Sequence, residues 1–216
     1  SDLNHFFESH NISAKWSHIV YTYYGSSAVL VLQDNPYTLL RIAPDMTFAT
    51  ADTLANQLGI PGDDERRLEA ALNWILRGLD DQGHTCLPVD ELIGKAVDVL
   101  KGYADEFADY VEMVIGQGIL YSTYFDDILY IYPPELYVAE CESVNYTKRF
   151  LEASSPVSLD IENFISNFES KHEITFGEEQ KEAIDLAFFE QFSVITGGPG
   201  TGKTTIIKAF VEGFQL

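Results

Sequence analysis

Apolar residues recur at helical spacing along most of the chain, and glycine and proline interrupt the pattern at intervals. Near the start, the spacing predicts short helices over residues 12–24, 28–32 and 48–58. The second helix should end where Asn35 precedes a proline, because a residue in that position avoids the helical conformation. Gly59 suits the C-terminal end of the third helix. We therefore expect the chain to begin with a helical region.

The next part of the chain has the pattern of a few helices followed by a β-hairpin. The helices are expected over residues 65–81, 89–100 and 105–115, and the hairpin over residues 119–133. Either Asp63 or Asp64 can cap the first helix, and Gly83 lies at its expected end. Residues 125–127 separate the two β-rich runs. Three helices and a hairpin is the order of elements in a winged-helix domain.

Beyond the hairpin, the pattern predicts further helices and one strand. The helices are expected over residues 133–150, 159–168 and 178–189, with two prolines tolerated in the first turn of the first helix. Serines around Pro156 mark a linker. Residues 192–196, FSVIT, form a short apolar run rich in β-forming residues, which predicts a buried strand.

The sequence after this run, GGPGTGKT at residues 197–204, fits the phosphate-binding pattern G-x-x-x-x-G-K-[ST]. Its glycines allow left-handed turns and let backbone amides approach phosphate oxygens closely. Lys203 would reach the β- and γ-phosphates of a nucleoside triphosphate, and the Thr204 hydroxyl would bind Mg²⁺. Residues 205–214 are compatible with a helix, which the motif requires. A glycine-rich turn that contains Lys-Thr by chance is the alternative interpretation.

Charge limits what the rest of the surface can bind. The 216 residues include 34 acidic and 13 basic side chains, which gives a net charge of −21. Phosphate contact needs a basic footprint, so the surface as a whole cannot hold nucleic acid, although a small patch could. At 46% hydrophobic residues, the chain can bury a core. No membrane span or secretory leader is visible, and two distant cysteines fit a reducing cytosol.

The phosphate loop and its flanks, SVITGGPGTGKTT and FGEEQKEAIDLAF, resemble the RecD-like (RecD/TraA) DNA helicases of superfamily one. In that family a glutamine before the loop reads the adenine ring, and Gln180 occupies this place. The upstream segments LQDNPYTLLRI, FATADTLANQLGIP, RRLEAALNWIL, GHTCLP and YPPELYVAE resemble, in their order, the long-form members that carry an extra N-terminal region. The resemblance covers most of the chain.

This resemblance implies a bacterial, cytoplasmic, ATP-driven helicase that moves 5′ to 3′ along single-stranded DNA in repair or recombination. Together with the pattern of elements, it predicts a mainly α fold in four parts. They are a helix–hairpin–helix-like region (1–61), a winged-helix-like domain (62–132), connecting helices (133–170) and the truncated start of a RecA-like α/β motor domain (171–216). DNA partners would be single strands or DNA ends, with no membrane involved.

The phosphate-binding pattern and, for Gln180, the resemblance assign the site residues. Lys203 and Thr204 would be catalytic, and Thr204 would hold Mg²⁺. ATP would contact Gln180, Gly197, Gly198, Pro199, Gly200, Thr201, Gly202, Lys203, Thr204 and Thr205. Hydrolysis also needs an acid on a later strand, and only twelve residues follow Thr204. We therefore interpret the chain as an N-terminal fragment with weak or no ATP turnover.

Other features keep alternatives open. The expected hairpin of the first region, residues 44–47, has no glycine, and its Asp45 would repel phosphate. Arg66, Arg67 and Arg77 could form a basic patch, although a solvated helix face is the simpler interpretation. The acidic helical region could instead dock a protein partner, with the loop incidental. A P-loop NTPase of another kind, such as a recombination or partition ATPase, is the third possibility.

Overall fold

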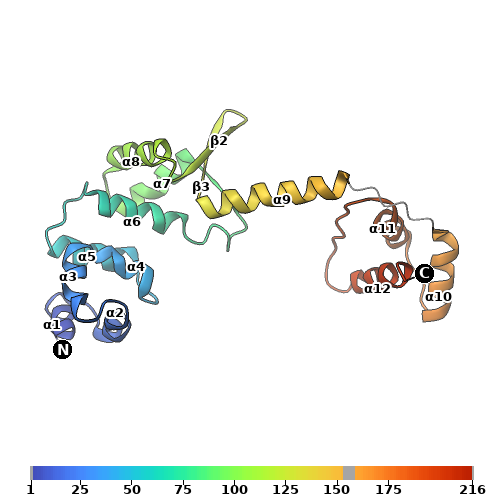
Figure 1. Ribbon diagram of the computed structural model, residues 1–216, viewed down its shortest axis with the longest axis horizontal. Helices are drawn as coiled ribbons and strands as arrows, with labels where there is room; N and C mark the ends of the chain where they lie inside the picture. Colours follow the sequence, from blue (N-terminus) through green and yellow to red (C-terminus); the bar gives the residue numbers. More distant parts are fainter. Residues whose placement is uncertain (1, 153–158, 216) are drawn as a thin grey trace. The chain divides into compact units, whose positions relative to one another are not determined.

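The computed structural model describes residues 2–152 and 159–215, and it is mainly helical, as predicted (Figure 1). The chain divides into two compact units, residues 1–139 and 140–216. We call them unit 1 and unit 2. None of the helices in the described ranges combines the length and the apolar character that crossing a bilayer requires.

Unit 1 begins with short helices that follow the predicted pattern in part. They are α1 (Asp2–Ser9), the 3₁₀ turn η1 (Ala14–Trp16), α2 (Ser17–Tyr24), the 3₁₀ turn η2 (Gly25–Ser27) and α3 (Ala28–Asp34). The first predicted helix is thus split into a 3₁₀ turn and α2. Helix α1 was not predicted, although Leu3, Phe6 and Phe7 have helical spacing and are all buried.

A helix–hairpin–helix arrangement follows. The 3₁₀ turn η3 (Pro36–Thr38) and α4 (Leu39–Ile42) precede the loop of residues 43–47, and α5 (Phe48–Gln57) follows it. The loop needs no glycine, because Asp45 itself adopts the left-handed conformation, with φ of 59°. Thr47 then caps α5, since its hydroxyl oxygen accepts a hydrogen bond from the Thr50 amide at 3.2 Å.

Helix α6 (Glu65–Leu76) begins as predicted but ends early. Asp64 is the N-cap, and its carboxylate accepts a hydrogen bond from the Arg66 amide at 2.9 Å. The prediction that the helix continues to residue 81 was wrong. Gly78 has a φ of 76°, which turns the chain and brings Leu79 into the core, where it is buried. The His84 amide closes this turn by donating to the Leu79 carbonyl at 2.8 Å.

Two more helices and a small antiparallel sheet complete unit 1. They are α7 (Val89–Leu100), α8 (Ala104–Gly116), β1 (Leu87–Pro88), β2 (Tyr121–Phe125) and β3 (Ile128–Tyr132), with the strand order β1-β3-β2. Asp126 and Asp127 form the hairpin turn with φ values of 47° and 62°, as a tight two-residue turn requires. The predicted hairpin is confirmed, while its likeness to a winged-helix domain stays a prediction.

A buried ion pair joins the helix–hairpin–helix region to the helices that follow it. Arg67 on α6 is 5% exposed. Its guanidinium contacts both carboxylate oxygens of Asp52 on α5, at 2.7 and 2.9 Å, and donates to the backbone carbonyls of Gly62 and Leu100. Tyr37 donates to the same carboxylate at 2.6 Å, and burial together with this bond raises the pKa of Tyr37. One hydrophobic core runs through both regions, and the finer four-part division stays a prediction.

The long helix α9 (Pro134–Glu152) begins in unit 1 and continues into unit 2, and the predicted serine linker lies outside the described residues. Unit 2 contains α10 (Ile161–His172), α11 (Glu178–Phe189) and α12 (Lys203–Gly213) around a phenylalanine-rich core.

Hydrogen bonds from Lys171 and then His172 lower the pKa of Glu212. At a pH above the ordinary pKa of a glutamate, the ionised Glu212 carboxylate therefore stabilises unit 2. This contribution is lost as the pH falls through the lowered pKa of Glu212.

The predicted strand over residues 192–196 is absent from the described structure. This segment has no regular secondary structure and no strand partner among the described residues, and Val194 is 75% exposed. A β-strand is defined by hydrogen bonds to a neighbouring strand, and the apolar run has no such neighbour within residues 2–152 and 159–215. The prediction that the segment is buried was wrong for the same reason.

Gly213 at the end of α12 is a point of close packing in unit 2. A Cβ atom there would lie 2.3 Å from Cζ of Phe188. We expect Gly213→Ala to destabilise unit 2 by about 1–3 kcal/mol, because the aromatic core must shift to admit the methyl group. Hydrogen exchange of the α10–α12 amides measures this. Gly116→Ala in α8, where a Cβ would meet open space, is the matched control, and equal effects in both variants would contradict the prediction.

Candidate nucleotide-binding loop

The glycine loop of residues 197–202 leads directly into α12, as the motif predicts. Gly200 and Gly202 have φ values of 78° and 83°, in the left-handed region that favours glycine. The first amide groups of a helix have no partner within the helix, and the helix dipole adds partial positive charge at the same end. The loop and the first turn of α12 therefore form a place where an anion is stabilised.

Lys203 is the first residue of α12, and its side chain folds back across the loop. The ammonium nitrogen donates to the carbonyl oxygens of Gly197 and Gly198, at 2.5 and 2.6 Å. The Thr201 hydroxyl donates to the Gly198 carbonyl at 2.9 Å and holds the same turn. The Lys203 ammonium thus contacts neutral carbonyl acceptors. Phosphate oxygens can take the place of these carbonyls, because their negative charge makes the hydrogen bonds to the ammonium stronger.

Gln180 connects α11 to this loop. Its side-chain oxygen accepts a hydrogen bond from the Gly177 amide at 2.9 Å, and its side-chain nitrogen donates to the Thr201 carbonyl at 3.0 Å. A glutamine amide has two N–H groups and two acceptor positions, so one of each remains for a ligand. A hydrogen-bonding edge that presents one donor and one acceptor, as adenine does, matches this pair.

Close packing shows that the loop needs its glycines. A Cβ atom on Gly202 would lie 2.4 Å from the side-chain nitrogen of Gln180, and one on Gly197 would lie 2.8 Å from the Thr201 hydroxyl. Thr204 is exposed in the first turn of α12, and no hydrogen bond joins its hydroxyl to another described residue. The residues present thus fit a magnesium-bound nucleoside triphosphate.

The structure joins the two segments that carry the predicted nucleotide set, α11 with Gln180 and the loop of residues 197–205. The set comprises Gln180, Gly197, Gly198, Pro199, Gly200, Thr201, Gly202, Lys203, Thr204 and Thr205. Their roles toward ATP and Mg²⁺ stay predictions. Within the described ranges, no three His, Cys, Asp or Glu side chains gather as metal ligands, and Cys86 and Cys141 are free thiols.

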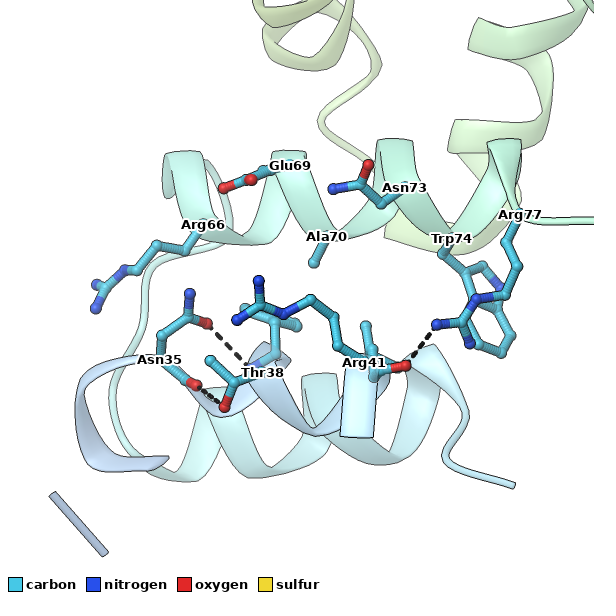
Figure 2. A pocket seen from close by; sticks show the side chains of 11 residues that line it. Asn35, Thr38, Arg41, Arg66, Glu69, Ala70, Asn73, Trp74 and Arg77 are labelled. Carbon is cyan, nitrogen blue, oxygen red and sulfur yellow. Dashed lines mark hydrogen bonds between the residues drawn. The ribbon is translucent and has the colours of Figure 1, made fainter. Parts of the chain in front are cut away.

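Of Arg66, Arg67 and Arg77, Arg67 does not belong to the solvated face that the sequence favoured. Arg67 is buried in its ion pair with Asp52, and Arg66 pairs with Asp64 at 2.8 Å. Arg66 and Arg77 instead line a cavity of unit 1 together with Arg41, which the sequence did not single out (Figure 2). Arg41 was missed because it comes from α4, and no local spacing relates it to α6.

Comparisons with known proteins agree with this fold and site. Residues 1–86 match the family described as the ATP-dependent RecD2 DNA helicase HHH domain, and residues 180–215 match a family described as an AAA domain. The second match contains Gln180 and the glycine loop. The chain is also 28% identical, over 202 residues, to the ATP-dependent RecD2 DNA helicase of Deinococcus radiodurans. That alignment covers 88% of this chain and 28% of the relative's length.

Fold and site together define the class: a helical helix–hairpin–helix region followed by the start of an AAA-type nucleotide-binding domain. Within that class, the chain is similar to the RecD-like helicases, and it spans about a quarter of the length of the RecD2 relative that it matches.

Proposed function

We propose that this chain binds ATP with Mg²⁺ through residues 197–205 and supplies the first part of the motor of an ATP-dependent DNA helicase. One observation carries the proposal. Lys203, the glycine loop and Gln180 form a single hydrogen-bonded group at the start of α12. A chance glycine-rich turn would not explain why a glutamine from another helix is fixed to the same loop.

Each residue has a distinct role in this proposal. The loop amides and the N-terminus of α12 would bind the phosphates, and the Lys203 ammonium would exchange its bonds to the Gly197 and Gly198 carbonyls for bonds to phosphate oxygens. Thr204 would place its hydroxyl on Mg²⁺, which supplies charge neutralisation between phosphates when bound. Gln180 would use its remaining donor and acceptor on the adenine edge. We expect binding without substantial turnover in this chain.

The likeness to a RecD2 helicase supports a wider proposal for the intact protein. It would move 5′ to 3′ along single-stranded DNA, act at DNA ends in repair or recombination, and work in the bacterial cytoplasm. The helices and hairpin of residues 62–132 would serve as a winged-helix-like domain. In this chain α8 exposes Asp105, Glu106, Asp109 and Glu112, so that helix is unsuited to enter a DNA groove.

The same acidic surface supports a second candidate function. Exposed carboxylates on α8 are available to a basic protein partner, and they would favour such a partner electrostatically. Under this candidate function, unit 1 docks a protein, and the glycine loop has no ligand. Saturable binding of an ATP analogue to the chain separates the two functions, because only the first requires it.

Gln180→Ala tests the adenine role. We expect the dissociation constant for magnesium-ATP to rise about tenfold, because one or two hydrogen bonds to the base are lost, while that for magnesium-GTP changes little. Competition against a fluorescent ATP analogue measures both constants. Gln57→Ala, at an exposed position on α5, is the matched control. Equal losses for ATP and GTP would mean that Gln180 only supports the loop, which would contradict base reading.

A further inference from the structure

The arginines of unit 1 are concentrated at one cavity. The chain has five arginines, and three of them, Arg41, Arg66 and Arg77, line a cavity of about 140 Å³ between α6 and the segment formed by η3 and α4. Figure 2 shows the Arg41 guanidinium between α6 and the side chains of Asn35 and Thr38. The unit as a whole is strongly acidic, because residues 1–139 contain 21 Asp and Glu against 7 Lys and Arg. The cavity is therefore a basic exception on an acidic surface.

The three guanidinium groups differ in how far their charge is already used. Arg66 is paired with the Asp64 carboxylate. Arg77 donates to the backbone carbonyl of Leu40 and lies over the Trp74 ring, with 5.6 Å between the guanidinium carbon and the ring centroid, and neither contact neutralises it. Arg41 is exposed, and no hydrogen bond or ion pair joins its side chain to another described residue. Two arginines thus keep positive charge available to a ligand.

Neutral polar groups complete the lining. Asn35, Thr38 and Asn73 lie around the cavity, and Glu69 is the one acidic residue that lines it, so the arginines outnumber it. Asn35 and Thr38 are held in place, because the Asn35 side-chain oxygen accepts from the Tyr37 amide at 3.1 Å and the Thr38 hydroxyl donates to the Asn35 carbonyl at 2.9 Å. Two amide side chains beside arginine forks are a donor set that suits an oxyanion.

The basic cavity continues into a second one along the helix–hairpin–helix loop. This second cavity is lined by residues 40–47 and shares Leu40, Arg41, Trp74 and Arg77 with the first. The two together form an extended groove, which we call the arginine groove. It begins at Asn35 and reaches the hairpin loop at Thr47. An extended groove fits a chain of phosphates better than it fits a single small ion.

We propose that the arginine groove binds the phosphodiester backbone of single-stranded DNA. The proposal rests on the helicase function proposed above and gives that function a contact point in unit 1. Arginine forks match phosphate oxygens in a planar, paired geometry that lysine cannot provide. A single strand in the groove brings one or two phosphates to the arginines. In a duplex, the phosphates of the second strand would be repelled by the acidic side chains that surround the groove. The site therefore favours a single strand.

This site differs from binding by the hairpin backbone, which the sequence made doubtful because of Asp45. In the arginine groove the contacts come from the side chains of Arg41 on α4, Arg66 on α6 and Arg77 just after α6. Asp45 lines only the second of the two cavities, whereas Asn35 and Asn73 line only the first. Repulsion by Asp45 therefore acts at one end of the groove.

Arg41→Gln in the full 216-residue chain tests the proposal. The probe is a fluorescein-labelled oligo-dT followed by anisotropy over a range of salt concentrations. We expect the dissociation constant to rise about tenfold at low salt, because a charge-assisted contact to phosphate is lost. The slope of log affinity against log salt should fall by about 0.7, the single-strand value for one phosphate contact. Thermal unfolding should be unchanged, since Arg41 supports no other described residue.

Arg149→Gln is the matched control, because it removes the same charge from an exposed position on α9. A loss confined to Arg41→Gln supports the proposal. Equal losses in both variants, or no oligo-dT binding by the unchanged chain, would overturn it. Binding of a labelled hexa-aspartate peptide that depends on Arg41 while oligo-dT binding does not would assign the groove to an acidic protein partner. ATP-analogue binding by the same samples reports on the glycine loop separately, so failure here leaves that proposal intact.

Discussion

Lys203→Ala is expected to raise the dissociation constant for a magnesium-bound ATP analogue at least about a hundredfold. The ammonium is the only side-chain cation that contacts the glycine loop in the described structure, through the Gly197 and Gly198 carbonyls. Its loss removes contacts to two phosphate groups, and each charge-assisted hydrogen bond is worth about 1.5–3 kcal/mol. Fluorescence titration with a labelled analogue measures the change.

Lys208→Ala provides the comparison for this prediction. Lys208 lies further along α12, is exposed, and has its ammonium 3.3 Å from a ring nitrogen of His172 rather than at the loop. Removing it changes the net charge by the same amount without touching the proposed phosphate site. If both variants bound the analogue as well as the unchanged chain does, the loop would not be the nucleotide site.

Arg67→Ala should be the most destabilising single substitution in unit 1, by about 3–5 kcal/mol. It leaves the Asp52 carboxylate without its cation in a nearly closed environment and removes the donor to the Gly62 and Leu100 carbonyls. It also removes the packing of the guanidinium against Tyr103, which lies 5.4 Å away. Urea unfolding followed by tryptophan fluorescence measures the loss, since both tryptophans of the chain are in unit 1.

The neighbouring residue offers a matched test. Arg66 also pairs with an aspartate, but its side chain is 37% exposed, and ion pairs at exposed positions contribute about 0–1 kcal/mol. Arg66→Ala should therefore shift the unfolding midpoint only slightly. A similar loss of stability in the two variants would mean that burial of the Arg67 pair does not join the two halves of unit 1.

The sequence predicted local structure well where the signal was local. The bounds of α7 and α11 agree with the prediction, since apolar spacing and caps lie within each helix. The glycine loop was also predicted, because it follows from a short motif. The place of Gln180 and its adenine role came only from a family resemblance. Its hydrogen bond to the Thr201 carbonyl is a new finding that no spacing rule contains.

The misses share a physical cause, which is dependence on distant parts of the chain. Helix α6 ends at Leu76 because a turn is needed to bury Leu79 in the core. The apolar pattern alone predicts that the helix continues through this turn. The run at residues 192–196 has strand propensity, but the part of the chain that the structure describes offers it no neighbouring strand. Arg67 looked like a surface residue because its partner, Asp52, belongs to another helix. Helix propensity and periodicity cannot show such pairings.

The most direct test is the structure of this chain bound to a non-hydrolysable ATP analogue and Mg²⁺. We predict that the β- and γ-phosphates lie at the N-terminus of α12, that the Lys203 ammonium leaves the Gly197 and Gly198 carbonyls to contact them, and that the adenine meets Gln180. An analogue bound elsewhere, with the Lys203 contacts unchanged, would contradict the account.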